Sequence, residues 1–139
     1  MSRVSKVLHT GKTRTAGGRE NGASRSSDGR LDIRFAIPGS ARIGTNPEQL
    51  LAAAWSACFE SAIALAARKR KTVLPADVAI EAEVDLKAAD EGYYLSTRFH
   101  VSLPGIDRDI AQALIDEAHE NCPYSKATRG NIEVVINLI

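Results

Sequence analysis

Residues with special chemistry are scarce in this sequence of 139 residues. It contains two cysteines, three histidines, one methionine and one tryptophan, and only 5% of its residues are aromatic. The net charge is +1, so bulk charge gives no reason to expect nucleic acid or a membrane surface as a partner. Two cysteines in a reducing compartment are expected to be free thiols at rest.

Segments that would direct the chain to a membrane or out of the cell are not expected either. Residues 1–20 carry five Lys or Arg and no apolar run, which is unlike a signal peptide. No stretch is expected to be both apolar and long enough to span a bilayer. We therefore expect a cytoplasmic protein without a membrane partner.

The motifs of several enzyme classes are missing. His119 and Cys122 are three residues apart, but there is no Cys-x-x-Cys pair. His9 and His100 are expected on different strands, so no metal site is predicted and His119 is expected at the surface. The sequence has no Gly-x-Ser-x-Gly nucleophile motif. No P-loop or Gly-x-Gly-x-x-Gly motif follows a strand, so no nucleotide cofactor is implied.

What is present fits a single domain, residues 1–139, with a core, because 44% of the residues are apolar and 25% charged. Alternation of apolar and polar residues predicts strands over residues 3–10, 30–37, 78–88, 93–103 and 132–138. Helical spacing predicts two main helices, over residues 46–71 and 107–121. This order of elements indicates an α+β protein with mostly antiparallel sheet.

The first predicted helix has strong start signals. Asn46 is a good N-cap, Pro47 suits the first helical position, and Gln49 stands where a capping box requires it. An apolar stripe follows at three- and four-residue steps, consisting of Leu51, Trp55, Cys58, Ala62 and Leu65. Four consecutive cations at residues 68–71 are expected to form its solvated end.

Cys58 lies twelve residues into that helix, too far from the first turn for the helix dipole to activate its thiol. An unperturbed cysteine has a pKa of about 8.5, so only a few per cent is thiolate at neutral pH. A nearby guanidinium would favour the thiolate, and Arg19 is the best candidate because the glycines beside it permit a tight turn. The alternative is that Cys58 is a small buried core residue.

Cys122 lies at the end of the second predicted helix, directly before Pro123. This position suits a thiol that must approach another thiol, and it equally suits a packed terminal cysteine. The sequence does not show whether the Cα atoms of Cys58 and Cys122 come within the roughly 7 Å limit for a disulfide. On the residues alone, both interpretations stay open.

Five short segments, spread in order along nearly the whole chain, form a recognisable set. They are Gly-Gly-Arg at 17–19, Ser-Asp-Gly at 27–29, Asn-Pro-Glu-Gln-Leu at 46–50, Ser-Ala-Cys-Phe at 56–59 and Cys-Pro-Tyr-Ser-Lys-Ala-Thr-Arg-Gly-Asn-Ile at 122–132. Together they resemble the organic hydroperoxide resistance proteins of the osmotically inducible protein C (OsmC) superfamily. The resemblance implies an OsmC-like α+β fold and an intertwined homodimer with two sites at the subunit interface.

The resemblance also implies a reaction. It implies a thiol peroxidase that reduces organic hydroperoxides, including those of fatty acids, to alcohols without metal, haem or other cofactor. Cys58 matches the peroxidatic cysteine, which forms a sulfenic acid, and Cys122 matches the resolving cysteine, which forms an intramolecular disulfide with it. Arg19 and Glu48 match the pair that activates and orients the site. The implied reductant is a dihydrolipoyl protein or dihydrolipoamide.

Three apolar residues near Cys58 are candidates for an acyl-chain pocket: Leu51, Trp55 and Phe59. The alternative for each is an ordinary place in the core. Leu51 and Trp55 stand where Phe and Tyr are usual in the family, which bears on substrate preference. A different class of function uses the same fold without catalysis, as a stress-response protein that binds a small ligand and has an inert Cys58.

The spacing of Glu48 and Cys58 carries a geometric consequence. Ten residues of one straight helix separate them by about 15 Å, so their side chains do not readily meet. If Glu48 holds Arg19 against Cys58, either the helix bends or the pair comes from the other subunit. We expect the second, a site shared between two chains.

Overall fold

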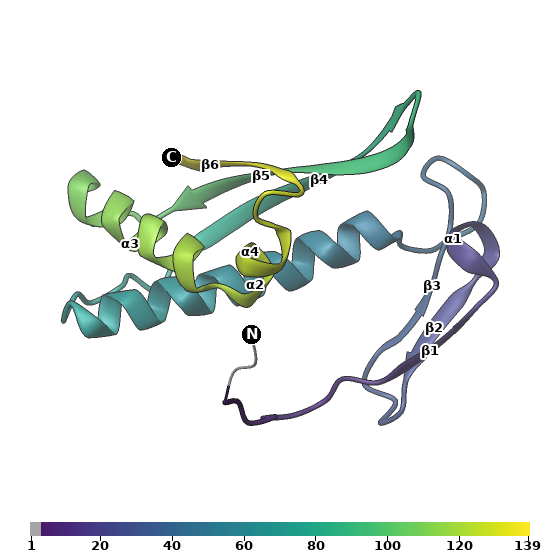
Figure 1. Ribbon diagram of the computed structural model, residues 1–139, viewed down its shortest axis with the longest axis horizontal. Coiled ribbons are helices and arrows are strands. Elements are labelled where there is room, and N and C mark those ends of the chain that lie inside the picture. The colour runs from purple at the N-terminus through teal and green to yellow at the C-terminus, as the bar shows by residue number, and fades with distance from the viewer. Residues whose placement is uncertain (1–3) are drawn as a thin grey trace. The chain divides into compact units, whose positions relative to one another are not determined.

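The computed structural model describes residues 4–139, which form two compact units. The first unit ends at Pro47 and contains β1 (Thr13–Ala16), α1 (Gly18–Asn21), β2 (Ala23–Ser26) and β3 (Asp32–Arg34). The rest of the chain contains α2 (Pro47–Lys69), β4 (Ala79–Ala89), β5 (Gly92–Ser102), α3 (Arg108–Asn121), α4 (Pro123–Thr128) and β6 (Glu133–Leu138) (Figure 1). The assignment of residues 1–139 to a single domain stays a prediction.

The first unit is a three-stranded antiparallel sheet in the order β1-β2-β3. The strand predicted over residues 3–10 is wrong for the described residues 4–10, because the first strand begins at Thr13; residue 3 lies outside the described residues. All side chains from 4 to 10 are exposed, so the weak alternation there has no apolar face to bury.

A tight turn around Arg19 is present, as the neighbouring glycines predict. Gly17 and Gly18 have φ angles of 89° and 71°, a region that favours glycine. A side chain at Gly22 would place its Cβ only 2.2 Å from the carbonyl oxygen of Gly18, so the chain closes on itself there. The result is one short helical turn, α1, that carries Arg19.

The second unit contains a sheet in the order β4-β5-β6, with α2 and α3 on one of its faces (Figure 1). β4 and β5 form an antiparallel hairpin, and β6 pairs parallel to β5 because α3 and α4 return the chain between them. The two main helices and the last three strands are confirmed near their predicted bounds. The short helix α4 was not predicted: Pro123 ends α3 and also begins α4, at a position that proline favours.

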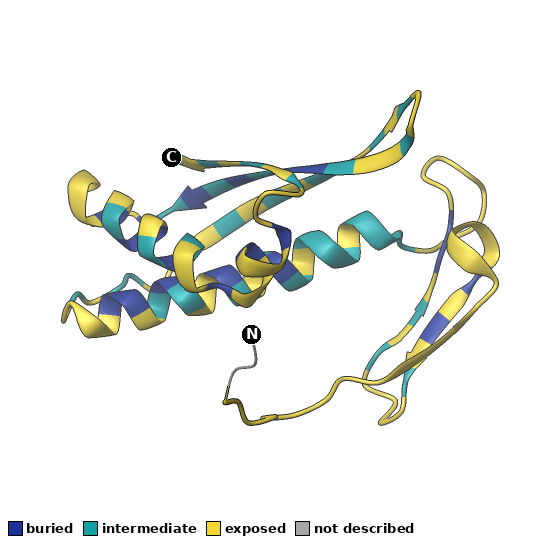
Figure 2. Ribbon diagram, viewed as in Figure 1, coloured by how far each residue is buried: buried dark blue, intermediate teal, exposed yellow. Residues whose placement is uncertain are grey.

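The core of the second unit is built around Phe99 on β5. Its ring lies edge-on to Trp55 and Phe59 of α2, with centroid distances of 5.2 and 5.3 Å, and all three side chains are fully buried. Aliphatic side chains of α2, β5 and α3 complete it: Ile63, Val101, Leu114 and Ile115. Figure 2 shows buried stretches, in dark blue, on α2, β5 and α3. The predicted stripe on α2 is partly wrong, because Leu65 is 45% exposed and Phe59 and Ile63 take the inner positions.

The expectation that no segment is apolar and long enough to span a bilayer is wrong for α2. Its 23 residues have a mean hydropathy of 1.6 over the most apolar window, which meets that requirement by length and composition. One such helix is weak evidence for a membrane protein, because the core helix of a soluble protein passes the same test. Trp55, Phe59 and Ile63 of α2 are fully buried within the fold.

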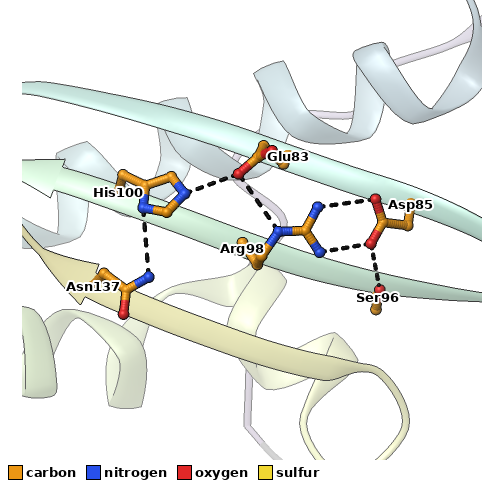
Figure 3. A network of polar contacts seen from close by, with 6 residues as sticks. All are labelled: Glu83, Asp85, Ser96, Arg98, His100 and Asn137. Carbon is orange, nitrogen blue, oxygen red and sulfur yellow. Dashed lines mark hydrogen bonds and ion pairs between the residues drawn. The ribbon is translucent and has the colours of Figure 1, made fainter.

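The opposite face of the sheet carries a polar network (Figure 3). Arg98 donates two hydrogen bonds to Asp85, at 2.6 and 3.0 Å, and forms an ion pair with Glu83 at 3.5 Å. Ser96 donates to Asp85, and His100 donates to Glu83 at 2.8 Å. The hydrogen bonds from Arg98 and Ser96, together with the charge of Arg98, hold the pKa of Asp85 well below its usual range. Cross-strand polar pairs therefore stabilise this face of the sheet, and the opposite, apolar face packs against α2 and α3.

The core geometry makes a prediction about stability. Replacing Phe99 by alanine removes the ring that contacts both Trp55 and Phe59, so the free energy of unfolding should fall by about 3–5 kcal/mol. Urea unfolding followed by circular dichroism measures it. Tyr93→Ala is the matched control on the same strand, since Tyr93 is 80% exposed, and should change stability by less than about 0.5 kcal/mol. Equal effects of the two substitutions would contradict this description of the core.

Candidate redox site

The structure brings Cys58 and Cys122 together. Cys58 is half-buried on α2, and Cys122 is fully buried at the junction of α3 and α4. Both are free thiols, and their side chains hydrogen-bond to each other. The two thiols, 64 residues apart in the sequence, are therefore neighbours in the fold. Their role as a disulfide-forming pair stays a prediction.

Some neighbours of Cys58 raise the pKa of its thiol and one lowers it. Burial raises the pKa of the Cys58 thiol, and so do the charge of Cys122 and the hydrogen bond between the two thiols. The backbone N–H of Tyr124 also bonds to Cys58 and lowers the pKa of the thiol, by favouring the thiolate. The net pKa is raised.

Tyr124 is the contributor that sequence reasoning missed. Cys122 has extended backbone angles, φ −61° and ψ 124°, and its N–H still donates to the carbonyl of Ala118 at 2.8 Å. Pro123 then begins α4, so Tyr124 provides the first backbone N–H of that helix. The Cys-Pro pair at a helix start was the available signal, since proline favours the first helical position and the next free N–H points away from the helix.

Behind the thiols lies a buried hydrogen-bond network. Ser125 on α4 is fully buried, and its Oγ accepts a bond from Trp55 Nε1 at 3.2 Å. The same Oγ lies 3.0 Å from Nδ1 of His119 on α3. The backbone oxygen of His119 in turn accepts a bond from the guanidinium of Arg129. His119 is half-buried, so it keeps part of its expected exposure while one side of the ring faces Ser125.

Arg19 and Glu48 lie in different units. Arg19 is on α1 of the first unit, and Glu48 is in the first turn of α2, as expected. α2 is a continuous helix from Pro47 to Lys69, so the ten residues from Glu48 to Cys58 span about 15 Å of its axis. Their action on Cys58 stays a prediction.

The three candidate pocket residues differ in burial. Trp55 and Phe59 are fully buried and pack on Phe99, whereas Leu51 is half-buried beside the same core. Within the second unit, Leu51 is thus the one of the three residues that remains partly exposed and could contact a ligand. Their role in substrate binding stays a prediction.

Metal ligands do not gather in the described part of the chain. Across residues 4–139, no group of three or more His, Cys, Asp or Glu side chains could hold a metal ion. His119 faces Ser125 and the ring of Phe59, with a ring-centroid distance of 6.4 Å.

Comparison with known proteins identifies the class to which this fold and thiol pair belong. Residues 38–137 match the family described as OsmC-like protein, and the chain belongs to that family. It is 41% identical to the "Organic hydroperoxide resistance protein" of Xanthomonas axonopodis pv. citri, over 99% of both chains. It is 39% identical to "Organic hydroperoxide resistance protein OhrA" of Bacillus subtilis, over 97% of this chain and 99% of that protein.

Solved structures show the same relationship. The crystal structure of OhrB of Bacillus subtilis superposes with a TM-score of 0.89 at 40% identity, covering 96% of this chain and all of that one. An organic hydroperoxide resistance protein from Legionella pneumophila gives a TM-score of 0.88 at 42% identity, covering 96% of this chain and 98% of that one. The predicted OsmC-like α+β fold, and membership of the superfamily, are therefore confirmed.

The half-buried position of His119 makes a prediction about pH. Burial and the charge of Arg129 lower the pKa of His119, against the opposing charges of Glu120 and Asp116. The unfolded chain, with an ordinary histidine pKa of about 6.5, then binds a proton that the folded protein resists. The stability due to neutral His119 is thus present above about pH 6.5 and declines as the pH falls toward the lowered folded pKa.

The measurement is the free energy of unfolding at about pH 7.5 and about pH 5.5, for the parent and for His119→Asn. The parent should lose more stability on acidification than the variant, since asparagine does not titrate. Parallel losses in the two proteins would show that His119 is not the titrating group.

Proposed function

We propose that this protein is a thiol-dependent peroxidase that reduces organic hydroperoxides, including those of fatty acids, to alcohols. The observation that supports it best is the hydrogen-bonded pair of free thiols, Cys58 and Cys122. Relatives along the full chain are named organic hydroperoxide resistance proteins. No cofactor is needed, because cysteine sulfur undergoes the required oxidation itself.

In the first step the thiolate of Cys58 attacks the terminal oxygen of the hydroperoxide. The sulfur–oxygen bond forms as the oxygen–oxygen bond breaks, and the leaving alkoxide takes a proton to become the alcohol. Cys58 is thereby oxidised to a sulfenic acid, and the peroxide is reduced by two electrons. Cys122 is the proposed resolving residue because its sulfur already contacts that of Cys58.

In the second step the sulfur of Cys122 attacks the sulfenic sulfur of Cys58 and expels water. The product is an intramolecular disulfide, which a dithiol reopens in two exchange reactions that oxidise the dithiol to its own disulfide. The proposed dithiol is a dihydrolipoyl protein or dihydrolipoamide. We place the protein in the cytoplasm, where reducing conditions keep the two cysteines as thiols.

Ionisation of Cys58 requires help, because burial raises the pKa of its thiol. Arg19 is proposed to provide the positive charge that favours the thiolate and balances the charge on the leaving oxygen. Glu48 is proposed to orient the guanidinium. Since Glu48 and Cys58 are about 15 Å apart along α2, we propose that Arg19 and Glu48 of one chain act on Cys58 of the other, in an intertwined homodimer.

Substrate preference is proposed to come from apolar surface near Cys58. Leu51 lies seven residues before Cys58, two helical turns away on nearly the same side of α2. It would contact an acyl chain directly, and the buried Trp55 and Phe59 would support that wall from behind. Apolar contacts of this kind favour bulky hydroperoxides over hydrogen peroxide, which has no chain to bury.

The first test is a turnover assay with dihydrolipoamide as reductant. The parent should consume cumene or linoleic acid hydroperoxide faster than hydrogen peroxide. Cys58→Ser should lower the rate by at least about a thousandfold, as expected for loss of an attacking nucleophile. Cys122→Ser should stall as the sulfenic acid, detected by mass as one added oxygen.

Two outcomes would contradict the proposal. Equal or negligible turnover of the organic and inorganic peroxides would refute the substrate class. A thiol that shows no rapid, pH-dependent alkylation, in a protein without turnover, would support the alternative of a non-catalytic stress-response protein that binds a small ligand.

The second test is subunit mixing. Cys58→Ser and Arg19→Ala homodimers should each be inactive. After unfolding and refolding together in equal amounts, half of the dimers are mixed, and each mixed dimer has one site with both groups intact. Activity should therefore return to about a quarter of the parent value. A mixture that stays inactive, with exchange verified by mass spectrometry, would show that both groups act within one chain.

A further inference from the structure

The hydroxyl of Ser125 links three helices behind the thiol pair. Ser125 belongs to α4, its indole partner Trp55 to α2, and its imidazole partner His119 to α3. The oxygen is fully buried, so these two side chains rather than water satisfy it. A buried polar group with directional partners restricts geometry more than apolar contact of the same area does.

The direction of the two hydrogen bonds follows from the donor inventory. An indole N–H only donates, so Ser125 Oγ accepts from Trp55 at 3.2 Å. We assign the single hydroxyl hydrogen to the other neighbour, Nδ1 of His119 at 3.0 Å, because the Oγ is fully buried and this nitrogen is its other partner. His119 is thus a neutral imidazole with its proton on Nε2. Burial, which lowers the pKa of His119, acts in the same direction.

Each residue of this network is close in sequence to a residue at the thiol pair. Trp55 is three residues before Cys58, His119 is three before Cys122, and Ser125 directly follows Tyr124. Tyr124 is the residue whose backbone N–H bonds to the sulfur of Cys58. Movement of Ser125 within its pocket would therefore move the Tyr124 N–H relative to Cys58.

We propose that Ser125 and His119 are positioning residues that hold the Tyr124 N–H on the sulfur of Cys58 and thereby set the reactivity of the thiol. Neither residue touches the substrate. Ser125 fixes α4 through its hydroxyl, and His119 accepts the hydroxyl hydrogen so that the oxygen keeps its orientation toward Trp55. The inference rests on the proposed function, because it concerns the thiol assigned there as the attacking group.

The test measures the pKa of Cys58 from the pH dependence of iodoacetamide alkylation, in full-length protein carrying Cys122→Ser so that one thiol reacts. Three variants are compared: Ser125→Ala, His119→Leu and His119→Asn. The two His119 variants form a matched pair, since both lose the ring and its contact with Phe59. Only asparagine retains a side-chain oxygen that can accept the Ser125 hydrogen bond.

Ser125→Ala and His119→Leu should raise the pKa of Cys58 by about half to one unit, which slows alkylation at neutral pH by about three- to tenfold. His119→Asn should stay within about twofold of the parent rate. His100→Gln, on the opposite face of the sheet, is the control for replacing a histidine and should match the parent. Near-ultraviolet circular dichroism of Trp55 reports whether each variant is folded.

Equal rates for His119→Leu and His119→Asn, or rates of folded variants that match the parent, would overturn the inference. So would faster alkylation in either the Ser125 or the His119→Leu variant. If Ser125→Ala does not fold, the His119 pair still decides. Because alkylation needs no peroxide, the two hypotheses fail separately: a parent without hydroperoxide turnover refutes the proposed function, whereas unchanged thiol pKa values in an active enzyme refute only this inference.

Discussion

The packing of Phe99 against Trp55 and Phe59 is the contact on which the candidate site depends. Trp55 precedes Cys58 by three residues and Phe59 follows it directly, so the two rings determine how α2 is rotated about its axis. Each residue along a helix turns the side-chain direction by about 100°. A different rotation of α2 would therefore place Cys58 in solvent or in the core, away from Cys122.

That same packing creates an electrostatic problem for thiol chemistry. Bringing Cys58 beside Cys122 partly buries it, and burial raises the pKa of a thiol that the proposed reaction needs as thiolate. Hydrogen-bond donors and cations lower the pKa of a thiol, so they can offset the effect of burial while the thiol stays buried. Tyr124 provides one donor within the second unit, and the proposed role of Arg19 is to add a charge. The proposed sharing of the site between two chains follows from the length of α2 between Glu48 and Cys58.

Prediction from sequence succeeded where the signals were local. The start of α2, the β4–β5 hairpin and α3 follow from a proline, a short polar turn and regular spacing of apolar residues. Prediction failed where partners decide: residues 4–10 alternate but have no strand beside them, and Leu65 shares a helical stripe that the sheet does not cover. The contact of His119 with Ser125 was missed for the same reason, since Ser125 lies on a helix that was not predicted.

The sequence by itself determined which chemistry is available: two thiols in a mixed α+β chain, one inside a long helix and one before a proline, with family motifs around both. Only the tertiary structure decided that these thiols meet, because 64 residues separate them and their encounter depends on how α2 packs against β5 and α3. It also decided which backbone N–H reaches Cys58. Local patterns encode helices and strands, whereas contacts between distant side chains arise from packing, which no local pattern records.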